Sequence, residues 1–355
     1  MIKPLVSIIV LMFLAGFKLC YSQNPEELKL KHFRPQSIFR IPITKITKAK
    51  YPVLDMHSHD FAKTDEQVAD WVKTMDQAGI EKTIILSGAT GSRFDSIYSR
   101  YIKYPARFEV WCGFDLNGYD EPGWSQKAVK ELERCVMAGA RGVGELSDKG
   151  FGLRYSGGFG PHINDPIMKP LLKKCAELNI PINIHVAEPL WMYLPMDSTN
   201  DGLMNANTWR IDSTVKGILG HAALIKTLDE AVQENPKTTF IACHYANCEY
   251  DLSILGSMLD KYPNLYADAA ARFGEVSTIP RYMRSFYEKY QDRLLYGTDN
   301  EPVSHMYEIT FRILETLDEH FYYYRFYHWP SYGFGLKDKI LKKVYHDNAK
   351  KILRK

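Results

Sequence analysis

Short apolar runs alternate with amphipathic stretches from about residue 51 to the C-terminus, and this alternation restricts the fold more than any other feature. The apolar runs show little polar alternation, which is typical of strands covered on both faces in a parallel sheet. Between them, apolar residues recur at helical spacing, as Val68, Trp71 and Met75 do. The predicted strands span residues 53–59, 82–87, 108–115, 140–146, 180–187, 238–245, 264–269 and 293–299. Eight strand–helix pairs in about 250 residues predict a single-domain α/β fold, the (βα)₈ or TIM barrel.

The N-terminal segment differs in character from the rest of the chain. Lys3 gives it a basic start, residues 5–17 are almost all apolar, and Cys20 and Ser22 are small residues near its end. The apolar run is short for a membrane span, so residues 1–22 are predicted to be a cleaved secretory signal peptide. An uncleaved membrane anchor and a lipid anchor at Cys20 are the alternatives. The mature protein is then expected to be secreted or periplasmic, without integration into a membrane.

The composition downstream of this segment excludes several classes of protein. Residues 23–50 are polar and are predicted to form an arm that crosses the surface of a barrel domain over residues 51–355. No Gly-x-Gly-x-x-Gly or Walker-type loop follows a predicted strand, which argues against a nucleotide-binding fold. The net charge is only +3 and the basic residues are scattered. We therefore expect neither nucleic acid nor a membrane surface as a partner.

The cysteines do not form the pattern of a disulfide framework. Without Cys20, their number in the mature chain is odd, and most fall in predicted strands or helices. We interpret them as small buried hydrophobic residues. They are Cys112, Cys135, Cys175, Cys243 and Cys248.

Polar side chains close five of the predicted strands. His57 and His59 end the first strand, and residues two apart in an extended chain point to the same face, here the barrel interior. The fourth, fifth, sixth and eighth strands end in Glu145, His185, His244 and Asp299. The carboxyl ends of the strands form the catalytic face of a barrel, where a buried polar group is costly unless it is paired or binds metal. The pattern therefore predicts a metal centre.

These residues, in this order and on these strands, resemble the metal site of the amidohydrolase superfamily. The resemblance runs from about residue 51 to the C-terminus, and residues 335–349 resemble the closing helix of the branch that includes decarboxylases and lactonases. In its single-ion form, the resemblance implies one divalent ion bound by four ligands. They are His57, His59, His185 and Asp299. Asp299 would also orient the attacking water.

The resemblance leaves the number of ions open. With one ion, His244 would be a free base or electrophile. In binuclear relatives, His185 and His244 would hold a second ion and Glu145 would bridge the two. The alternative role for Glu145 is a hydrogen bond to a ligand histidine. Imidazole and carboxylate ligands suit Zn²⁺, our first expectation, and also Mn²⁺, Fe²⁺ and Ni²⁺.

The expected activity is a hydrolase that acts on a small carboxylate, lactone, ester or amide. A bound metal lowers the pKa of water to about 7. Asp299 would then take the proton from that water, with His244 as the second catalytic residue. A non-oxidative decarboxylase on the same scaffold is the alternative. A barrel that binds metal or ligand without turnover is a third interpretation.

Long loops follow the fourth and fifth strands and the last barrel helix, and such loops usually carry function. Arg272 is a candidate to hold a substrate carboxylate, or else to pair with Asp268 or a loop carbonyl. Glu188 and Trp191 are candidates to line the pocket, although Trp191 is equally suited to anchor its own loop. Asn247, three residues past His244, is a further pocket candidate.

The last of these loops contains an aromatic run. It covers residues 321–324 and continues with His328 and Trp329. Aromatic residues are enriched at protein interfaces, which favours a homo-oligomer contact over a lid.

Overall fold

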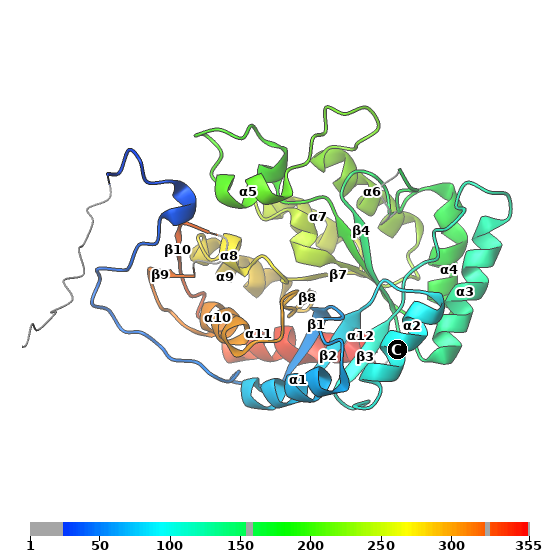
Figure 1. Cartoon of the computed structure of the whole chain (residues 1–355), viewed down its shortest axis with the longest axis horizontal. Coiled ribbons are helices and arrows are strands. Elements are labelled where there is room, and N and C mark those ends of the chain that lie inside the picture. The colour runs from blue at the N-terminus through cyan, green and yellow to red at the C-terminus, as the bar shows by residue number, and fades with distance from the viewer. Residues whose placement is uncertain (1–23, 154–158, 324–326, 354–355) are drawn as a thin grey trace, which may run out of the picture.

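The computed structural model describes residues 24–153, 159–323 and 327–353 (Figure 1). The predicted signal peptide lies outside these ranges, as does Tyr324 of the aromatic run. None of the helices in the described ranges has the length and apolar character of a membrane span.

Parallel strands succeed one another in chain order, as the sequence predicts. They are β1 (Val53–Ser58), β2 (Ile80–Leu86), β3 (Phe108–Trp111), β4 (Val143–Asp148), β5 (Ile182–Val186), β6 (Phe240–Ala242), β7 (Leu265–Asp268) and β8 (Leu294–Leu295). Two sheets result, β1-β2-β3 and β4-β5-β6-β7-β8. A parallel bridge between Cys112 and Val143 links β3 to β4. On the other side, the Met56 amide donates to the Tyr296 carbonyl at 3.0 Å and links β8 to β1. These links close the strands into a barrel.

Helices surround the strands (Figure 1). They are α1 (Asp65–Ala78), α2 (Gly91–Tyr101), α3 (Trp124–Ala138), α4 (Lys169–Glu177), α5 (Leu203–Trp209), α6 (His221–Glu234), α7 (Leu252–Lys261), α8 (Phe273–Val276), α9 (Pro280–Tyr290), α10 (Ser304–Glu315), α11 (Asp338–Lys342) and α12 (Asn348–Leu353). Two short strands, β9 (Phe321–Tyr322) and β10 (Pro330–Ser331), pair antiparallel beyond α10. Helix α1 begins where it does because Thr64 and Gln67 form a capping box.

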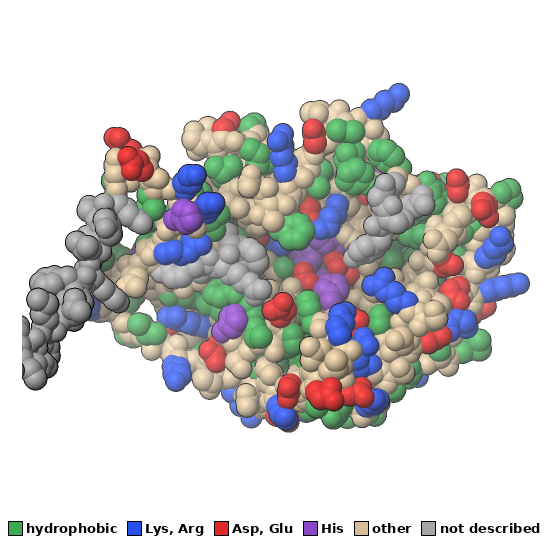
Figure 2. Space-filling model, in the orientation of Figure 1, with side chains coloured by type: hydrophobic (Ala, Val, Ile, Leu, Met, Phe, Trp, Pro, Cys, Tyr) green, Lys and Arg blue, Asp and Glu red, His purple; other side chains and the backbone are tan. Residues whose placement is uncertain are grey.

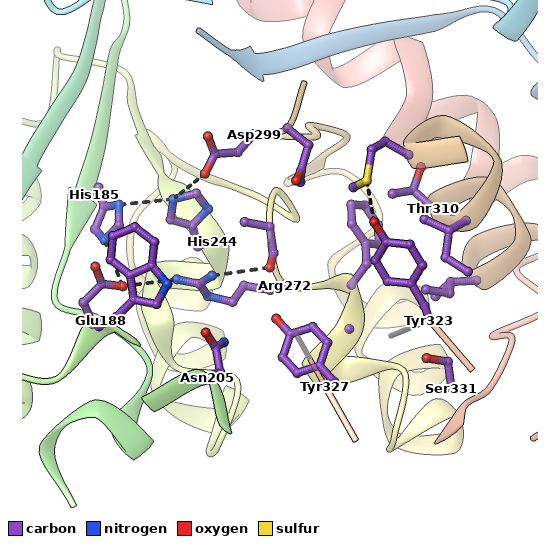
Figure 3. Close-up of a pocket in the computed structure, with 18 of the residues that line it drawn as sticks. His185, Glu188, Asn205, His244, Arg272, Asp299, Thr310, Tyr323, Tyr327 and Ser331 are labelled. Atoms are coloured by element: carbon purple, nitrogen blue, oxygen red, sulfur yellow. Dashed lines mark hydrogen bonds and ion pairs between the residues drawn. The ribbon is translucent and has the colours of Figure 1, made fainter. Parts of the chain in front are cut away.

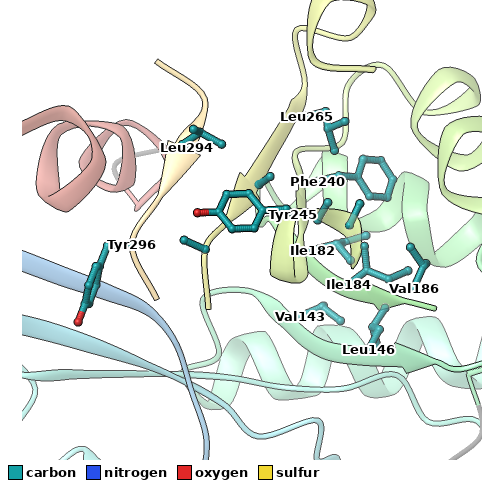
Figure 4. Packing of buried hydrophobic residues seen from close by; sticks show 14 of the residues in the cluster. Val143, Leu146, Ile182, Ile184, Val186, Phe240, Tyr245, Leu265, Leu294 and Tyr296 are labelled. Atoms are coloured by element: carbon teal, nitrogen blue, oxygen red, sulfur yellow. The ribbon is translucent and has the colours of Figure 1, made fainter. Parts of the chain in front are cut away.

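Alternate residues of each strand pack on opposite sides of the barrel wall. Phe240, Leu265 and Leu294 belong to the cluster between strands and helices (Figure 4). Ile241 and Leu295, one residue further along their strands, belong to a second cluster that also contains residues of α12. This is the two-residue period of strand geometry. Apolar side chains thus fill one part of the barrel interior, where Ala349 and Ile352 of α12 pack against them. The polar strand ends lie elsewhere.

Three predicted strands extend too far. The third was expected over residues 108–115, the sixth over 238–245 and the eighth over 293–299, but β3 ends at Trp111, β6 at Ala242 and β8 at Leu295. Beyond β8, the Tyr296 amide donates outside the sheet, to the Val344 carbonyl. Beyond β6, residues 244–247 all have left-handed φ values between 52° and 58°, and Asp299 likewise has a φ of 49°. Such values cost a non-glycine residue roughly 1–2 kcal/mol and end an extended strand. His244 and Asp299 therefore lie on turns just beyond the strands, and strain of this kind concentrates at functional sites.

Candidate metal centre

Four imidazoles converge at the carboxyl ends of the strands, and each is fixed by a hydrogen bond on its far side. His59 Nδ1 donates to the Leu86 carbonyl at 3.0 Å. His185 Nε2 donates to the Ala187 carbonyl at 2.7 Å, and His244 Nδ1 donates to the Ala270 carbonyl at 2.8 Å. A carbonyl only accepts, so these nitrogens carry hydrogen and the opposite nitrogens can offer a lone pair. Proteins orient metal-binding histidines in this way: a hydrogen bond holds one ring nitrogen, and the other nitrogen faces the metal.

The fourth imidazole, His57, is held by a carboxylate. Its Nδ1 lies 2.9 Å from Asp268 Oδ2. Its Nε2 is buried and has no hydrogen-bond partner in the described part of the chain. An orphaned buried nitrogen is costly unless a ligand completes it. Burial lowers the pKa of His57, but Asp268, Asp299 and Glu145 outweigh this effect and raise it to about 9. The surroundings therefore favour positive charge, which either protons or a divalent cation can supply.

Two carboxylates lie among these rings. Glu145 Oε1 is 2.8 Å from His185 Nδ1 and 3.4 Å from His244 Nε2, while its Oε2 is 3.4 Å from His59 Nε2. Asp299 Oδ1 is 2.9 Å from His59 Nε2. Burial raises the pKa of both carboxyls, but the histidines hold each pKa well below its usual range. Both groups are therefore charged at neutral pH.

Several donor atoms lie within 4.8 Å of one another, near the spacing that a divalent metal ion requires. Metal–ligand bonds of 2.0–2.3 Å place neighbouring donors of a tetrahedral ion roughly 3.3–3.8 Å apart. One group of mutually close donors comprises His57, His59 and Asp299, which we call the outer group. A second comprises His57, Glu145, Cys243 and His244, which we call the inner group, and its members are all buried.

Neither of these two groups includes His185, which the resemblance places with the strand-one pair in a single-ion site. Its Nδ1 lies 3.2 Å from His244 Nε2, and both nitrogens contact Glu145 Oε1. This arrangement corresponds to the set implied for the second ion of a binuclear site.

Asp268, on β7, is a central residue that the sequence suggested only as a partner for Arg272. Its carboxylate is fully buried and holds His57 Nδ1. It also accepts from the backbone amides of His244 at 2.9 Å and Ala270 at 3.1 Å. One carboxylate thus fixes a metal-ligand candidate and the strained turn that carries His244. Its position at the end of β7 was the available signal, because the polar ends of the other strands identified the site.

A cavity of about 230 Å³ adjoins the centre (Figure 3). His185, His244 and Asp299 line the cavity on the side of the metal centre. Charged residues such as Arg272 and apolar residues such as Phe273 line the rest. Figure 2 shows histidine and acidic side chains at the bottom of a hollow on this face. This volume is below the roughly 300–1,000 Å³ of pockets for drug-sized ligands, so the cavity suits a smaller molecule.

The residues predicted to bind substrate have different positions. Arg272 and Glu188 line the cavity, but Asn247 and Trp191 are not among its lining residues in the described ranges. Arg272 donates from Nε and Nη2 to Asn247 Oδ1 at 2.9 and 2.6 Å. It does not pair with Asp268, but its Nη1 donates to a loop carbonyl, that of Ala271, at 3.3 Å. Asn247 thus positions Arg272. Trp191 packs on Trp329 with ring centroids 5.8 Å apart, which matches its interpretation as a loop anchor.

The aromatic run packs largely within its own chain. Phe321 is buried, as is the neighbouring Tyr327, and the Trp329 indole donates to the Gly274 carbonyl at 3.0 Å. Tyr323 and Tyr327 line the cavity (Figure 3). The run therefore contributes to the pocket, and an oligomer contact stays a prediction.

Gly297, between β8 and Asp299, allows close approach of the strand-one histidine. A Cβ atom at this position would lie 2.7 Å from the Cβ of His57 and 3.2 Å from that of Ala270. We expect Gly297→Ala to lower the free energy of unfolding by about 1–3 kcal/mol through overpacking. It should also weaken Mn²⁺ binding, because His57 must move. Chemical denaturation and a Mn²⁺ titration test this. An unchanged free energy of unfolding together with an unchanged Mn²⁺ affinity would show that the contact is not tight.

Buried acidic groups surround Arg272, which lines the cavity. Its Nη2 lies 3.6 Å from Glu188 Oε2 and its Nη1 3.8 Å from Glu275 Oε1. Glu188 also forms an ion pair with Lys149. Both carboxylate oxygens of Glu249 are buried without a hydrogen-bond partner in the described ranges. Burial raises the pKa of Glu249 to about 7, against the attraction of Arg272.

This raised pKa predicts a pH dependence of stability. The folded chain keeps the Glu249 proton to higher pH than the unfolded chain, where the ordinary pKa is 4.5. The stabilisation that results from this pKa shift is therefore fully present below pH 4.5 and is lost as the pH rises through about 7. Between about pH 5 and pH 8, wild type should lose on the order of 1–3 kcal/mol more stability than Glu249→Gln. Urea denaturation at both pH values measures this. Exposed Glu234→Gln should behave as wild type, and equal pH dependence in all three proteins would contradict the prediction.

The sequence profile of the amidohydrolase family matches residues 44–355. Comparison with curated proteins gives no match. Among solved structures, the chain is similar to an uncharacterised TIM-barrel protein from Bordetella bronchiseptica. The two share 15% identity with a TM-score of 0.56, over 86% of this chain and 99% of that one.

Two decarboxylases are similar to the same extent. The 2,6-dihydroxybenzoate decarboxylase from Rhizobium has 16% identity and a TM-score of 0.54, over 86% of this chain and 99% of its own. The 5-carboxyvanillate decarboxylase from Novosphingobium aromaticivorans, solved with manganese and 4-hydroxy-3-methoxy-5-nitrobenzoic acid, has 16% identity and a TM-score of 0.52, over 88% of this chain and 100% of its own. At these identities the likeness shows the barrel fold. The family profile covers the whole barrel, and the chain therefore belongs to the amidohydrolase family.

Proposed function

We propose that the protein is a metal-dependent hydrolase that acts on a small carboxylate, lactone, ester or amide. The observation that carries this proposal is the position of Glu145. Its carboxylate lies within 3.4 Å of His59 Nε2 on one side and of His185 Nδ1 and His244 Nε2 on the other. A carboxylate between two sets of imidazoles suits a bridge between two ions, the arrangement that favours hydrolysis.

The residues suggest how the reaction is organised. A divalent ion held at these donors would lower the pKa of water and polarise a carbonyl oxygen. Asp299, which is ionised and faces the cavity, would take the proton of the attacking water. Burial lowers the pKa of His244, so this ring is neutral at pH 7 and can accept a hydrogen bond or a proton at Nε2. His244 Nε2 lies 3.8 Å from Asp299 Oδ2, close enough for both groups to act on one substrate.

The chemical types of the donor atoms restrict which metal ion the centre can bind. Zn²⁺ remains the first expectation from the ligand types, and Mn²⁺, Fe²⁺ and Ni²⁺ suit the same nitrogen and oxygen donors. Mn²⁺ gains support from the manganese in the solved 5-carboxyvanillate decarboxylase. We also propose, from the N-terminal sequence, that the protein acts outside the cytoplasm.

A non-oxidative decarboxylase is the second candidate, supported by the cations of the pocket. Arg272 and Lys149 line the cavity beside His244 and could attract a substrate carboxylate. Glu188 pairs with both cations and reduces this attraction in the free protein.

One experiment separates the candidates. The metal-loaded protein is incubated with lactones, esters and amides and, separately, with small aromatic and aliphatic carboxylic acids. Acid release from the first panel supports the hydrolase, and CO₂ release from the second supports the decarboxylase. A protein that binds metal but turns over neither panel would favour the non-catalytic interpretation and oppose both.

A further inference from the structure

The outer and inner groups share one atom, His57 Nε2. Because Asp268 occupies His57 Nδ1, this ring has a single nitrogen to offer. That nitrogen is fully buried and has no hydrogen-bond partner within the described ranges. It lies 3.8 Å from Asp299 Oδ1 of the outer group and 3.9 Å from Glu145 Oε1 of the inner group. One lone pair cannot bind two ions, so the two groups cannot both be filled completely.

The inner group differs from the outer group in its chemistry, because it contains a thiol. Cys243 follows β6 directly, and its ligand atom lies within 4.8 Å of those of His57, Glu145 and His244. The Cys243 thiol donates to Asn183 Oδ1 at 2.8 Å, which orients the sulfur. His57, Cys243 and His244 are almost completely shielded from solvent, while the side chains of His59 and Asp299 are 28% and 24% exposed.

Donor chemistry assigns different ions to the two groups. Imidazole and carboxylate alone suit hard or borderline ions such as Mn²⁺, whereas a thiolate selects softer ions. We infer that the inner group is a further cation site, distinct from the proposed catalytic sites and selective for thiophilic divalent ions. An ion bound there excludes an ion from the outer group. Binding there would also engage Glu145 and His244, two of the three residues that surround the proposed second catalytic ion. Soft ions such as Cd²⁺ would therefore inhibit the enzyme loaded with Mn²⁺. The inference rests on the proposed function for the outer group.

Cd²⁺ and Mn²⁺ are suitable probes because the first is thiophilic and the second is not. Chelator-treated protein is loaded with Mn²⁺ and then titrated with Cd²⁺. Electron paramagnetic resonance measures the Mn²⁺ released, and ultraviolet difference absorption measures the sulfur-to-cadmium charge-transfer band. We expect the band to grow in proportion to the Mn²⁺ released. The thiol proton passes to solvent as the cadmium–sulfur bond forms.

Two cysteine variants identify the sulfur. Cys243→Ser keeps a donor for Asn183 and should still bind Mn²⁺. It should lose the band and bind Cd²⁺ at least about 100-fold more weakly, because even residues that only hydrogen-bond to a metal ligand contribute up to about 100-fold to metal affinity. Cys248→Ser is the matched control. This cysteine is also buried and lies close in sequence, but its thiol donates to the Ala246 carbonyl and it belongs to neither group. It should behave as wild type.

Other results would overturn the inference. Cd²⁺ binding without the band, or a band that persists in Cys243→Ser, would show that Cys243 is not a ligand. A band that forms without release of Mn²⁺ would show that the two groups are not exclusive. Failure of wild type to bind Mn²⁺ at all would instead count against the proposed function, so the two failures are distinguishable.

Discussion

The Asp299→Asn variant should lose about 10²–10⁴ in kcat, the range typical of a missing acid–base group. The amide has the shape of the carboxylate but cannot take a proton from the attacking water. The ion pair with His59 and the lowered pKa of Asp299 indicate that its charge stabilises the metal-free protein, so the apoprotein should lose part of its free energy of unfolding but still fold. Steady-state kinetics at saturating metal, with thermal unfolding of the apoprotein, measure both effects.

A surface variant provides the control for this prediction. Asp120→Asn removes an exposed acid on a loop and should leave kcat unchanged. If Asp299→Asn retained near-full activity with metal bound, the proposed proton transfer would be wrong.

The second large effect is expected from Asp268→Ala, which removes the acceptor shared by His57 and the turn that carries His244. Breaking a buried charged network of this kind costs about 3–5 kcal/mol of unfolding free energy. Loss of the partner that orients His57 should weaken Mn²⁺ binding by about 10–100-fold. Denaturant unfolding in the presence of chelator measures the first effect, and a Mn²⁺ titration measures the second.

Asp115→Ala is the comparison for this variant. Asp115 follows β3 as Asp268 ends β7, but its carboxylate accepts from Asn117 in an exposed loop. Its loss should cost about 0.5 kcal/mol and leave metal binding intact. If Asp268→Ala matched Asp115→Ala in both measurements, the shared role of Asp268 would be refuted.

Much of the fold was predictable because a parallel barrel leaves a regular trace in sequence. Strands covered on both faces read as continuous apolar runs, and helices between them read as apolar residues at helical spacing. The polar strand ends were conspicuous against that background. His57, Glu145 and His185 lie on strands β1, β4 and β5, as expected.

The turn after β6 had no comparable signal. Tyr245 and Ala246 adopt left-handed φ values of 53° and 56°, which sequence alone assigns to glycine or asparagine. The strand therefore seemed to continue, and the orientation of His244 could not be derived. The pairing of Arg272 with Asn247 likewise depends on tertiary packing between two loops.

Two residues of the metal centre, Cys243 and Asp268, were not predicted to belong to it. Cys243 resembles a core cysteine in sequence, although the two-residue period from Ile241 places it on the interior face of the barrel. Asp268 was considered only as a partner for Arg272. Asp268 lies one residue before the end of the predicted strand, as Glu145 does, so the same criterion would have found it.

The measurement to make first is Mn²⁺ binding to chelator-treated protein, compared between wild type and the His57→Ala/His59→Ala double variant. We predict at least one ion per wild-type chain and loss of that ion in the variant. The bound ion should also raise the stability of wild type alone through ligand linkage. Substantially less than one ion per wild-type chain, or equal binding in the variant, would contradict a metal centre at these strand ends.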